Sequence, residues 1–147
     1  MSKMELLHAF IGRLENCTKK DGTLYPSSDW RRSYCAYRGI IAVYVDTEDD
    51  LVTVCFYPDE QGQHLQTTAG HLEIFEPNYI IITRNSEYFF KEIGIDESER
   101  ESLSRTYEAM NVPKDVIEKV IAEAIEIGNL HTKQVRAHSM LRDDEER

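Results

Sequence analysis

Cysteine is scarce in this sequence and shows none of the spacings that hold a zinc ion or a disulfide framework. The three cysteines among 147 residues are Cys17, Cys35 and Cys55, an odd number without a CxxC pair. We interpret them as free thiols, and Cys55 as a small apolar residue within the apolar run 52–56. A chain of this length buries about 70% of its unfolded surface, so it needs no crosslink to form a core.

Long apolar runs are also missing. No stretch approaches the roughly 20 consecutive apolar residues that cross a bilayer as a helix. Residues 1–5 lack the apolar core and the small-residue cleavage site of a secretory signal. We therefore expect a cytoplasmic protein.

Signatures of common catalytic sites are absent as well. The sequence has no GxSxG nucleophile motif and no glycine-rich phosphate loop. His64 and His71 match no metal-ligand spacing, and the acidic residues in 46–50 lack the spacing of a calcium loop. We expect no cofactor and no bound metal, and we favour a noncatalytic protein.

Basic residues are outnumbered, and they are unevenly placed. The chain has 17 Lys and Arg against 27 Asp and Glu, for a formal net charge of −10. Residues 1–40 hold seven basic and four acidic residues, so this stretch carries +3 and the remainder −13. An acidic protein repels nucleic acid and anionic lipid. We expect neither direct nucleic-acid binding nor a membrane partner, although the basic N-terminal stretch can hold one phosphate or carboxylate.

The pattern of apolar residues predicts a helix followed by two hairpins. Within residues 3–16, Leu7, Phe10, Ile11 and Leu14 have helical spacing, which predicts an amphipathic helix. Turn-forming residues then predict a long loop over 17–39, and loops of that length are often functional. Four further apolar segments predict strands that form two β-hairpins. Residues 40–45 are expected to pair with 51–57, and residues 72–75 with 79–83.

Residues after Asn85 read as helices. Ser86 is a candidate N-cap for a short helix through residue 93 that ends at Gly94. Asp96 and Glu99 have the spacing of a capping box before a second helix. Pro113 opens the most regular helix, in which one apolar stripe contains Val116, Ile117, Val120, Ile121, Ala124 and Ile125. Gly128 and Asn129 are expected to end that helix.

These elements together predict an α+β fold. It has an N-terminal helix, an antiparallel sheet of about four strands in two hairpins, and C-terminal helices packed on the sheet. Residues 1–129 are expected to form a single domain. Residues 130–147 carry fewer apolar positions and are expected to be a C-terminal helix or a frayed tail.

A run of arginines and aromatic residues within the predicted long loop is a candidate ligand-binding site. Trp30, Arg31, Arg32, Tyr34 and Arg38 lie within nine positions of one another. Arginine offers two parallel donors to a phosphate or carboxylate, and aromatic rings stack on bases and guanidinium groups. The alternative is structural, with Trp30 and Tyr34 anchoring the loop to the core while the arginines pair with nearby acids. The sequence leaves both readings open.

Glutamates on the predicted C-terminal helices form a second candidate surface. The residues proposed to contact a partner are Glu97, Glu101, Glu108, Glu118 and Glu123. Few basic residues accompany them, so such a face can attract a basic protein. The alternative is an ordinary solvated helix face.

The sequence therefore favours a noncatalytic cytosolic binding or regulatory protein that acts by contact with another protein through an acidic surface. An inhibitor, an immunity-type protein and a chaperone-like protein all fit this description, and a homodimer stays open. The alternative is a small anionic-ligand-binding domain or enzyme that uses the arginine and tyrosine cluster before the first hairpin.

Overall fold

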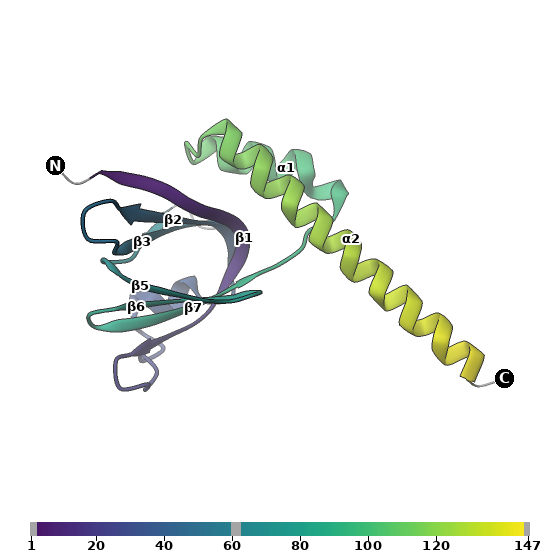
Figure 1. Cartoon of the computed structure of the whole chain (residues 1–147), viewed down its shortest axis with the longest axis horizontal. Coiled ribbons are helices and arrows are strands. Elements are labelled where there is room, and N and C mark those ends of the chain that lie inside the picture. The colour runs from purple at the N-terminus through teal and green to yellow at the C-terminus, as the bar shows by residue number, and fades with distance from the viewer. Residues whose placement is uncertain (1–2, 60–62, 146–147) are drawn as a thin grey trace.

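The computed structural model describes residues 3–59 and 63–145, and the side chains of residues 3–59 and 63–132. In this part of the chain, seven strands form one antiparallel sheet, and two helices follow it (Figure 1). The strands are β1 (Met4–Lys19), β2 (Arg38–Asp46), β3 (Val52–Pro58), β4 (Leu65–Gln66), β5 (Gly70–Phe75), β6 (Asn78–Thr83) and β7 (Ser86–Glu92). A short 3-10 helix, η1 (Trp30–Tyr34), lies between β1 and β2.

The sheet curls until it closes on itself. The strand order is β2-β1-β7-β6-β5-β3-β4, and β2 also pairs with β3 along seven residue pairs, 39–45 with 52–58. The first part of β1 pairs with β2 and its last part pairs with β7. Gly12 pairs with both neighbours at this bend, and a Cβ atom there would lie 2.4 Å from the carbonyl oxygen of Lys91. Glycine therefore lets β1 turn the corner without a clash.

The interior of this closed sheet is filled by large apolar side chains. Alternate residues point inward, so Val52, Val54 and Phe56 of β3 are buried while the residues between them are partly exposed. Phe10 stacks on Tyr79 with ring centroids 4.2 Å apart. The interior cluster contains Phe10, Leu14, Cys17, Tyr34, Ile41, Val43, Val52, Val54, Phe56, Leu65, Tyr79, Ile81, Tyr88 and Phe90.

The expected N-terminal helix is wrong, because residues 4–19 form the longest strand of the sheet. Phe10 and Leu14 point into the interior, whereas Ile11 packs on the opposite side against the helices. Both sides of this strand are covered, so apolar residues follow one another without a clean two-residue period. The helical spacing of Leu7 and its neighbours is a coincidence, and Leu7 itself is exposed beside a bulge.

The expected short helix over residues 86–93 is also wrong. These residues form β7, in which Tyr88 and Phe90 point inward. Aromatic residues favour strands, and pairing with β1 and β6 on both edges outweighs the weak capping signal of Ser86. The predicted four-stranded sheet with an N-terminal helix is thus replaced by seven strands followed by two helices.

Both predicted hairpins are confirmed. β2 pairs with β3, and β5 pairs with β6, each extending one or two residues beyond most of the predicted ends. The predicted loop before the first hairpin contains η1, which Asp29 caps by accepting a hydrogen bond from the backbone N–H of Arg31. The segment between the two hairpins contains β4, and residues 60–62 of that segment lie outside the described residues.

The two helices pack on the outer side of β1 and β2. A capping box at Asp96 and Glu99 precedes α1 (Arg100–Ala109), as the sequence predicts. It caps the short 3-10 helix η2 (Glu97–Glu99), which leads directly into α1. The helix α2 (Lys114–Glu145) begins just after Pro113. The outer cluster contains Ala9, Ile11, Ile40, Ile95, Leu103, Tyr107, Val112, Ile117, Val120, Ile121, Ala124 and Ile125. No helix in the described part of the chain is long and apolar enough to cross a membrane.

The expected helix end at Gly128 is wrong, because α2 continues to Glu145 and extends away from the sheet (Figure 1). Gly128 serves close packing instead of a cap. A Cβ atom at this position would lie 2.2 Å from the carbonyl oxygen of Ile95, and one at Gly94 would lie 2.5 Å from the Gly128 nitrogen. The chain after β7 therefore crosses α2 at a contact between two glycines. Residues 146–147 of the predicted tail lie outside the described residues.

Candidate functional site

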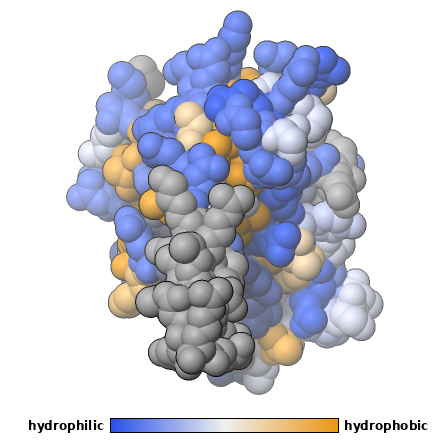
Figure 2. Space-filling view, turned by 90° about the vertical axis from the view of Figure 1, so that its right-hand side faces the viewer, coloured by the Kyte–Doolittle hydropathy of each residue, from blue (hydrophilic) through white to orange (hydrophobic). Residues whose placement is uncertain are grey.

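A groove of about 820 Å³ lies where the chain leaves β7 and crosses α2. Its position depends on the glycine contact, and the backbone N–H of Ile95 donates a 3.0 Å hydrogen bond to the carbonyl of Ala124 in α2. The groove is lined by Pro77, residues 91–96, Glu99, residues 127–129, and residues 131 and 132. Figure 2 looks at this side of the molecule and shows apolar patches beside α2 among hydrophilic side chains.

The walls of the groove combine aliphatic and acidic side chains. Ile93 and Ile127 are partly exposed there. The acidic residues are Glu92, Asp96 and Glu99, of which Glu99 pairs with Arg38, and the lining also contains one lysine, Lys91. An apolar wall gains free energy by covering a hydrophobic side chain, and a carboxylate attracts a cation. The groove is therefore chemically suited to a ligand that is both apolar and cationic.

Glu92 is a partly buried carboxylate of the groove. Burial raises its pKa, and the negative charges of Glu123 and Glu76 raise it further, while a hydrogen bond from Tyr79 opposes them. These three acids come from β7, α2 and the β5–β6 turn, and we call them the carboxylate cluster. Their mutual repulsion leaves a site where a positive charge is favoured.

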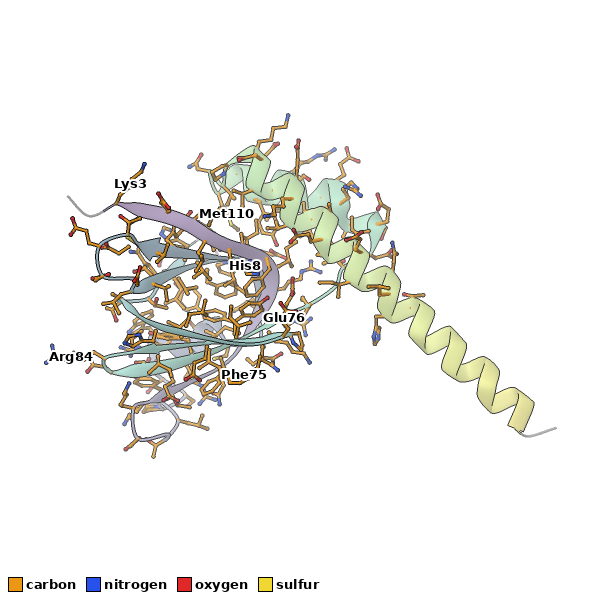
Figure 3. The ribbon with its side chains drawn as sticks, viewed as in Figure 1. Lys3, His8, Phe75, Glu76, Arg84 and Met110 are labelled. Atoms are coloured by element: carbon orange, nitrogen blue, oxygen red, sulfur yellow. The ribbon has the colours of Figure 1, made fainter. Side chains whose placement is uncertain are left out.

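A short polar path leads from the carboxylate cluster into the closed sheet. The Nε2 atom of His8 lies 3.2 Å from the hydroxyl oxygen of Tyr79, and the two rings stack with centroids 5.4 Å apart. Burial and the charge of Glu92 raise the pKa of Tyr79 to about 12, so the phenol stays neutral. Figure 3 labels His8 and Glu76 on the side of the sheet that faces α2.

The predicted ligand-binding segment is divided by the structure. Tyr34 is buried in the interior cluster, whereas Trp30 is 54% exposed. Arg31 forms an ion pair of 3.1 Å with Asp29, and its guanidinium lies over the Trp30 ring, 4.7 Å from the ring centroid. The Nη1 atom of Arg32 donates to the carbonyl of Tyr25 at 3.1 Å.

Arg38 shares none of these partners. Its Nε donates to Asp59 at 2.8 Å and its Nη1 donates to Glu99 at 2.9 Å. Burial raises the pKa of Tyr107, and the charge and hydrogen bond of Asp59 act in the same direction. Arg38 therefore belongs to a polar group that joins β2 to η2 and α1. It also lines a separate polar pocket of about 280 Å³ with Arg13, Ala36, Tyr37 and Asp59.

The five predicted partner-binding glutamates differ in their surroundings. Glu97 pairs with Arg100 at 2.7 Å and Glu101 pairs with Arg105 at 2.6 Å, both on the exposed surface. Glu108 and Glu118 are exposed, and no ion pair is recorded for them among the described residues. Glu123 is partly buried in the carboxylate cluster. Only Glu123 of the five therefore belongs to the carboxylate cluster, and none of the five lines the groove itself.

Glu76 and Glu92 were not among the predicted site residues. Glu92 lay within the wrongly predicted helix over residues 86–93, and the groove and the carboxylate cluster form only where α2 crosses the chain after β7. The available signal was Gly128, an isolated glycine in an otherwise helical run, which usually has a packing reason. Around the groove and in the rest of the described chain, no three His, Cys, Asp or Glu side chains are arranged to hold a metal ion. No family model, curated protein or solved structure matches this chain.

Proposed function

We propose that this is a noncatalytic binding protein that accepts a segment of another protein in the groove beside α2. The occupant carries apolar side chains together with at least one lysine or arginine. The observation that carries the proposal is the position of Glu92 in the groove, a partly buried carboxylate whose pKa is raised by burial and by the charges of Glu123 and Glu76. A cation placed there removes a repulsion that the folded chain retains by itself.

The size and walls of the groove support a peptide segment as the occupant. About 820 Å³ is within the range of sites that hold a compact ligand. Segments that dock in grooves commonly use a few apolar anchors for affinity and charges for orientation. The aliphatic side chains of Ile93 and Ile127 supply contacts for such anchors, and the acids supply the orientation.

Selection from a library of random twelve-residue peptides displayed on phage tests the proposal. We expect the enriched peptides to combine Lys or Arg with Leu, Ile or Phe, and to bind more weakly as salt rises. Their amide chemical-shift changes in the protein should map to residues 91–96 and 127–132. Enrichment of acidic peptides, or of none, would contradict the proposal.

A matched pair of variants separates the groove from general acidity. Glu92→Gln and Glu108→Gln each remove one negative charge, but only the first lies in the groove. We expect Glu92→Gln to weaken the selected peptides about tenfold or more and Glu108→Gln to leave them within about twofold. Equal losses in the two variants would show that the peptides respond to net charge alone.

A further inference from the structure

The end of the closed sheet away from the groove is built by the connection between β1 and β2. This connection folds onto the β6–β7 turn, where the hydroxyl of Tyr25 contacts the Oγ of Ser86. The Nζ of Lys20 donates to the carbonyl of Thr83 at 3.1 Å, and Leu24 pairs back with Thr18 in an isolated β-bridge. These contacts hold two loops together as one surface.

Basic side chains gather on this surface. Lys19 is the last residue of β1, Lys20 begins the β1–β2 connection, and Arg84 lies in the β6–β7 turn. All three are exposed, and the loops also carry Arg31 and Arg32. Figure 3 shows Arg84 at the opposite end of the molecule from Glu76 and α2. Four of the seven basic residues of 1–40 therefore lie at this end, whereas Arg38 pairs with Glu99 of the groove.

Two exposed apolar side chains accompany these cations. Leu24 and Trp30 are each 54% exposed. The guanidinium of Arg31 lies over the Trp30 ring, and Tyr34 meets that ring edge-on at 6.3 Å. We call Lys19, Lys20, Leu24, Trp30 and Arg84 the loop-end surface. Tryptophan and leucine next to lysine and arginine are the combination that enters the interface of an anionic bilayer.

We propose that the loop-end surface docks on an anionic lipid membrane, with Leu24 and Trp30 entering the headgroup region. The basic residues lie close to the lipid phosphates and carboxylates, where each cation contributes attraction. The acidic groove lies at the other end and is kept away from the membrane by the same field. The acidic β2–β3 turn, with Glu48, Asp49 and Asp50, lies at the same end as Arg84, so the loop-end surface docks with that turn directed away from the lipid. This revises the expectation of no membrane partner, which rested on the net charge of the whole chain. It is independent of the proposed peptide groove.

A nucleic acid explains the surface less completely. Bases bind by stacking on aromatic faces, and the Arg31 guanidinium already lies over the Trp30 ring. An exposed leucine adds little to contacts with phosphates or bases, whereas it gains free energy in the acyl region of a bilayer. A single-stranded oligonucleotide is nonetheless the alternative that the experiment includes.

The intrinsic fluorescence of Trp30 tests the proposal directly, because this is the single tryptophan of the chain. The probes are vesicles of phosphatidylcholine alone and vesicles in which about a third of the lipid is phosphatidylserine. With the anionic vesicles we expect a blue shift, and quenching by lipids that carry a nitroxide on the acyl chain. Neutral vesicles should give neither signal.

Variants of the loop-end surface sharpen the result. We expect Lys19→Ala/Arg84→Ala to lower the vesicle partition coefficient about 30-fold and Leu24→Ala about tenfold, with Trp30 retained as the reporter. The matched control, Lys114→Ala/Lys119→Ala, removes the same charge from α2 and should change partitioning less than twofold. Circular dichroism and thermal melts establish that each variant folds.

Three outcomes would overturn the proposal. The first is no blue shift with anionic vesicles at low salt. The second is equal loss of partitioning in the loop-end and α2 lysine variants, which would indicate an unspecific charge effect. The third is tight binding of a single-stranded oligonucleotide without vesicle binding, which would assign the surface to nucleic acid.

Discussion

Two carboxylates at opposite ends of the closed sheet have opposite surroundings. At the loop end, Asp29 accepts hydrogen bonds from the backbone and the guanidinium of Arg31. At the groove end, Glu92 is repelled by the charges of Glu76 and Glu123. The pKa of Asp29 is lowered chiefly by the Arg31 backbone N–H, and the pKa of Glu92 is raised by burial and by those acids. Asp29 thus has a cation as its partner within the fold, whereas Glu92 has the neutral phenol of Tyr79 beside two like charges. A net charge of −10 describes neither site.

This difference indicates where the molecule has unused binding capacity. A carboxylate that the fold already pairs contributes to stability and has little left to offer a partner. A partly buried carboxylate among like charges is stabilised by a bound cation that the fold itself does not supply. The groove is therefore the stronger candidate for binding a cation, and the loop end binds through its exposed lysines and its leucine and tryptophan.

Replacing Gly128 should have the largest effect on the free energy of unfolding, and this effect should be confined to the groove end. In Gly128→Val, the new side chain meets the Ile95 carbonyl, and a Cβ there would already lie 2.2 Å from its oxygen. We expect a loss of about 3 kcal/mol in the free energy of unfolding, measured by urea denaturation. The fluorescence of native Trp30 should stay the same, because the loop end is remote from the substitution.

Ala122→Val is the matched control for this prediction. It introduces the same β-branched residue at an exposed position of α2 and should lose well under 1 kcal/mol. If the two variants lose equal stability, the cost lies in helix propensity, and the glycine contact does not position α2.

The glycine contact also illustrates what the sequence could and could not predict. The two hairpins and the capping box at Asp96 were predictable because turn residues, alternation and caps are local signals. Gly128 carries the same local signal as a helix end, and only its contact with the chain after β7 shows its packing role. The groove depends on that contact, so neither its shape nor the convergence of the carboxylate cluster could be derived from residue spacing.

The strands β1 and β7 were missed for a related reason. They pair with each other across a long separation in sequence, as Gly12 does with Glu92. Burial on both faces of β1 also removes the two-residue alternation that identifies a strand. The division of the arginines follows from the chain reversal before β2, where Ala36 has a φ of 76° and Arg38 points to Asp59 and Glu99. Composition alone contains no sign of that reversal.

Removing the carboxylate at the loop end should give a smaller loss than Gly128→Val. Asp29→Ala removes the cap of η1 and the ion pair of Arg31, so we expect the thermal midpoint at neutral pH to fall by a few degrees. The pKa of Asp29 is lowered in the folded protein, so its contribution is present above the ordinary value of 3.8 and disappears as the pH falls through the folded value.

Asp29→Asn distinguishes the two contributions of this side chain. The amide oxygen can still accept from the backbone N–H of Arg31, but the ion pair is lost. Retention of most of the wild-type midpoint would assign the stability to the cap. A midpoint as low as that of Asp29→Ala would assign it to the charge.

Removing the carboxylate at the groove end should produce the smallest change, and one of opposite sign. Glu92 has a raised pKa, so its folded form holds a proton more tightly than the unfolded chain, and the associated stability is present below the ordinary value of 4.5. That stability is lost as the pH rises through the folded value. Glu92→Gln cannot ionise, and we therefore expect it to be more stable than the wild type at neutral pH and indistinguishable from it in acid.

Urea denaturation of Glu92→Gln at neutral pH and below the ordinary glutamate pKa measures this difference, with Glu108→Gln as the control that should show no gain at either pH. If Glu92→Gln proves less stable than the wild type at neutral pH, the hydrogen bond from Tyr79 outweighs the repulsion from Glu76 and Glu123. The groove end would then resemble the loop end, with its carboxylate already satisfied by the fold, and the electrostatic basis for a cationic occupant would be lost.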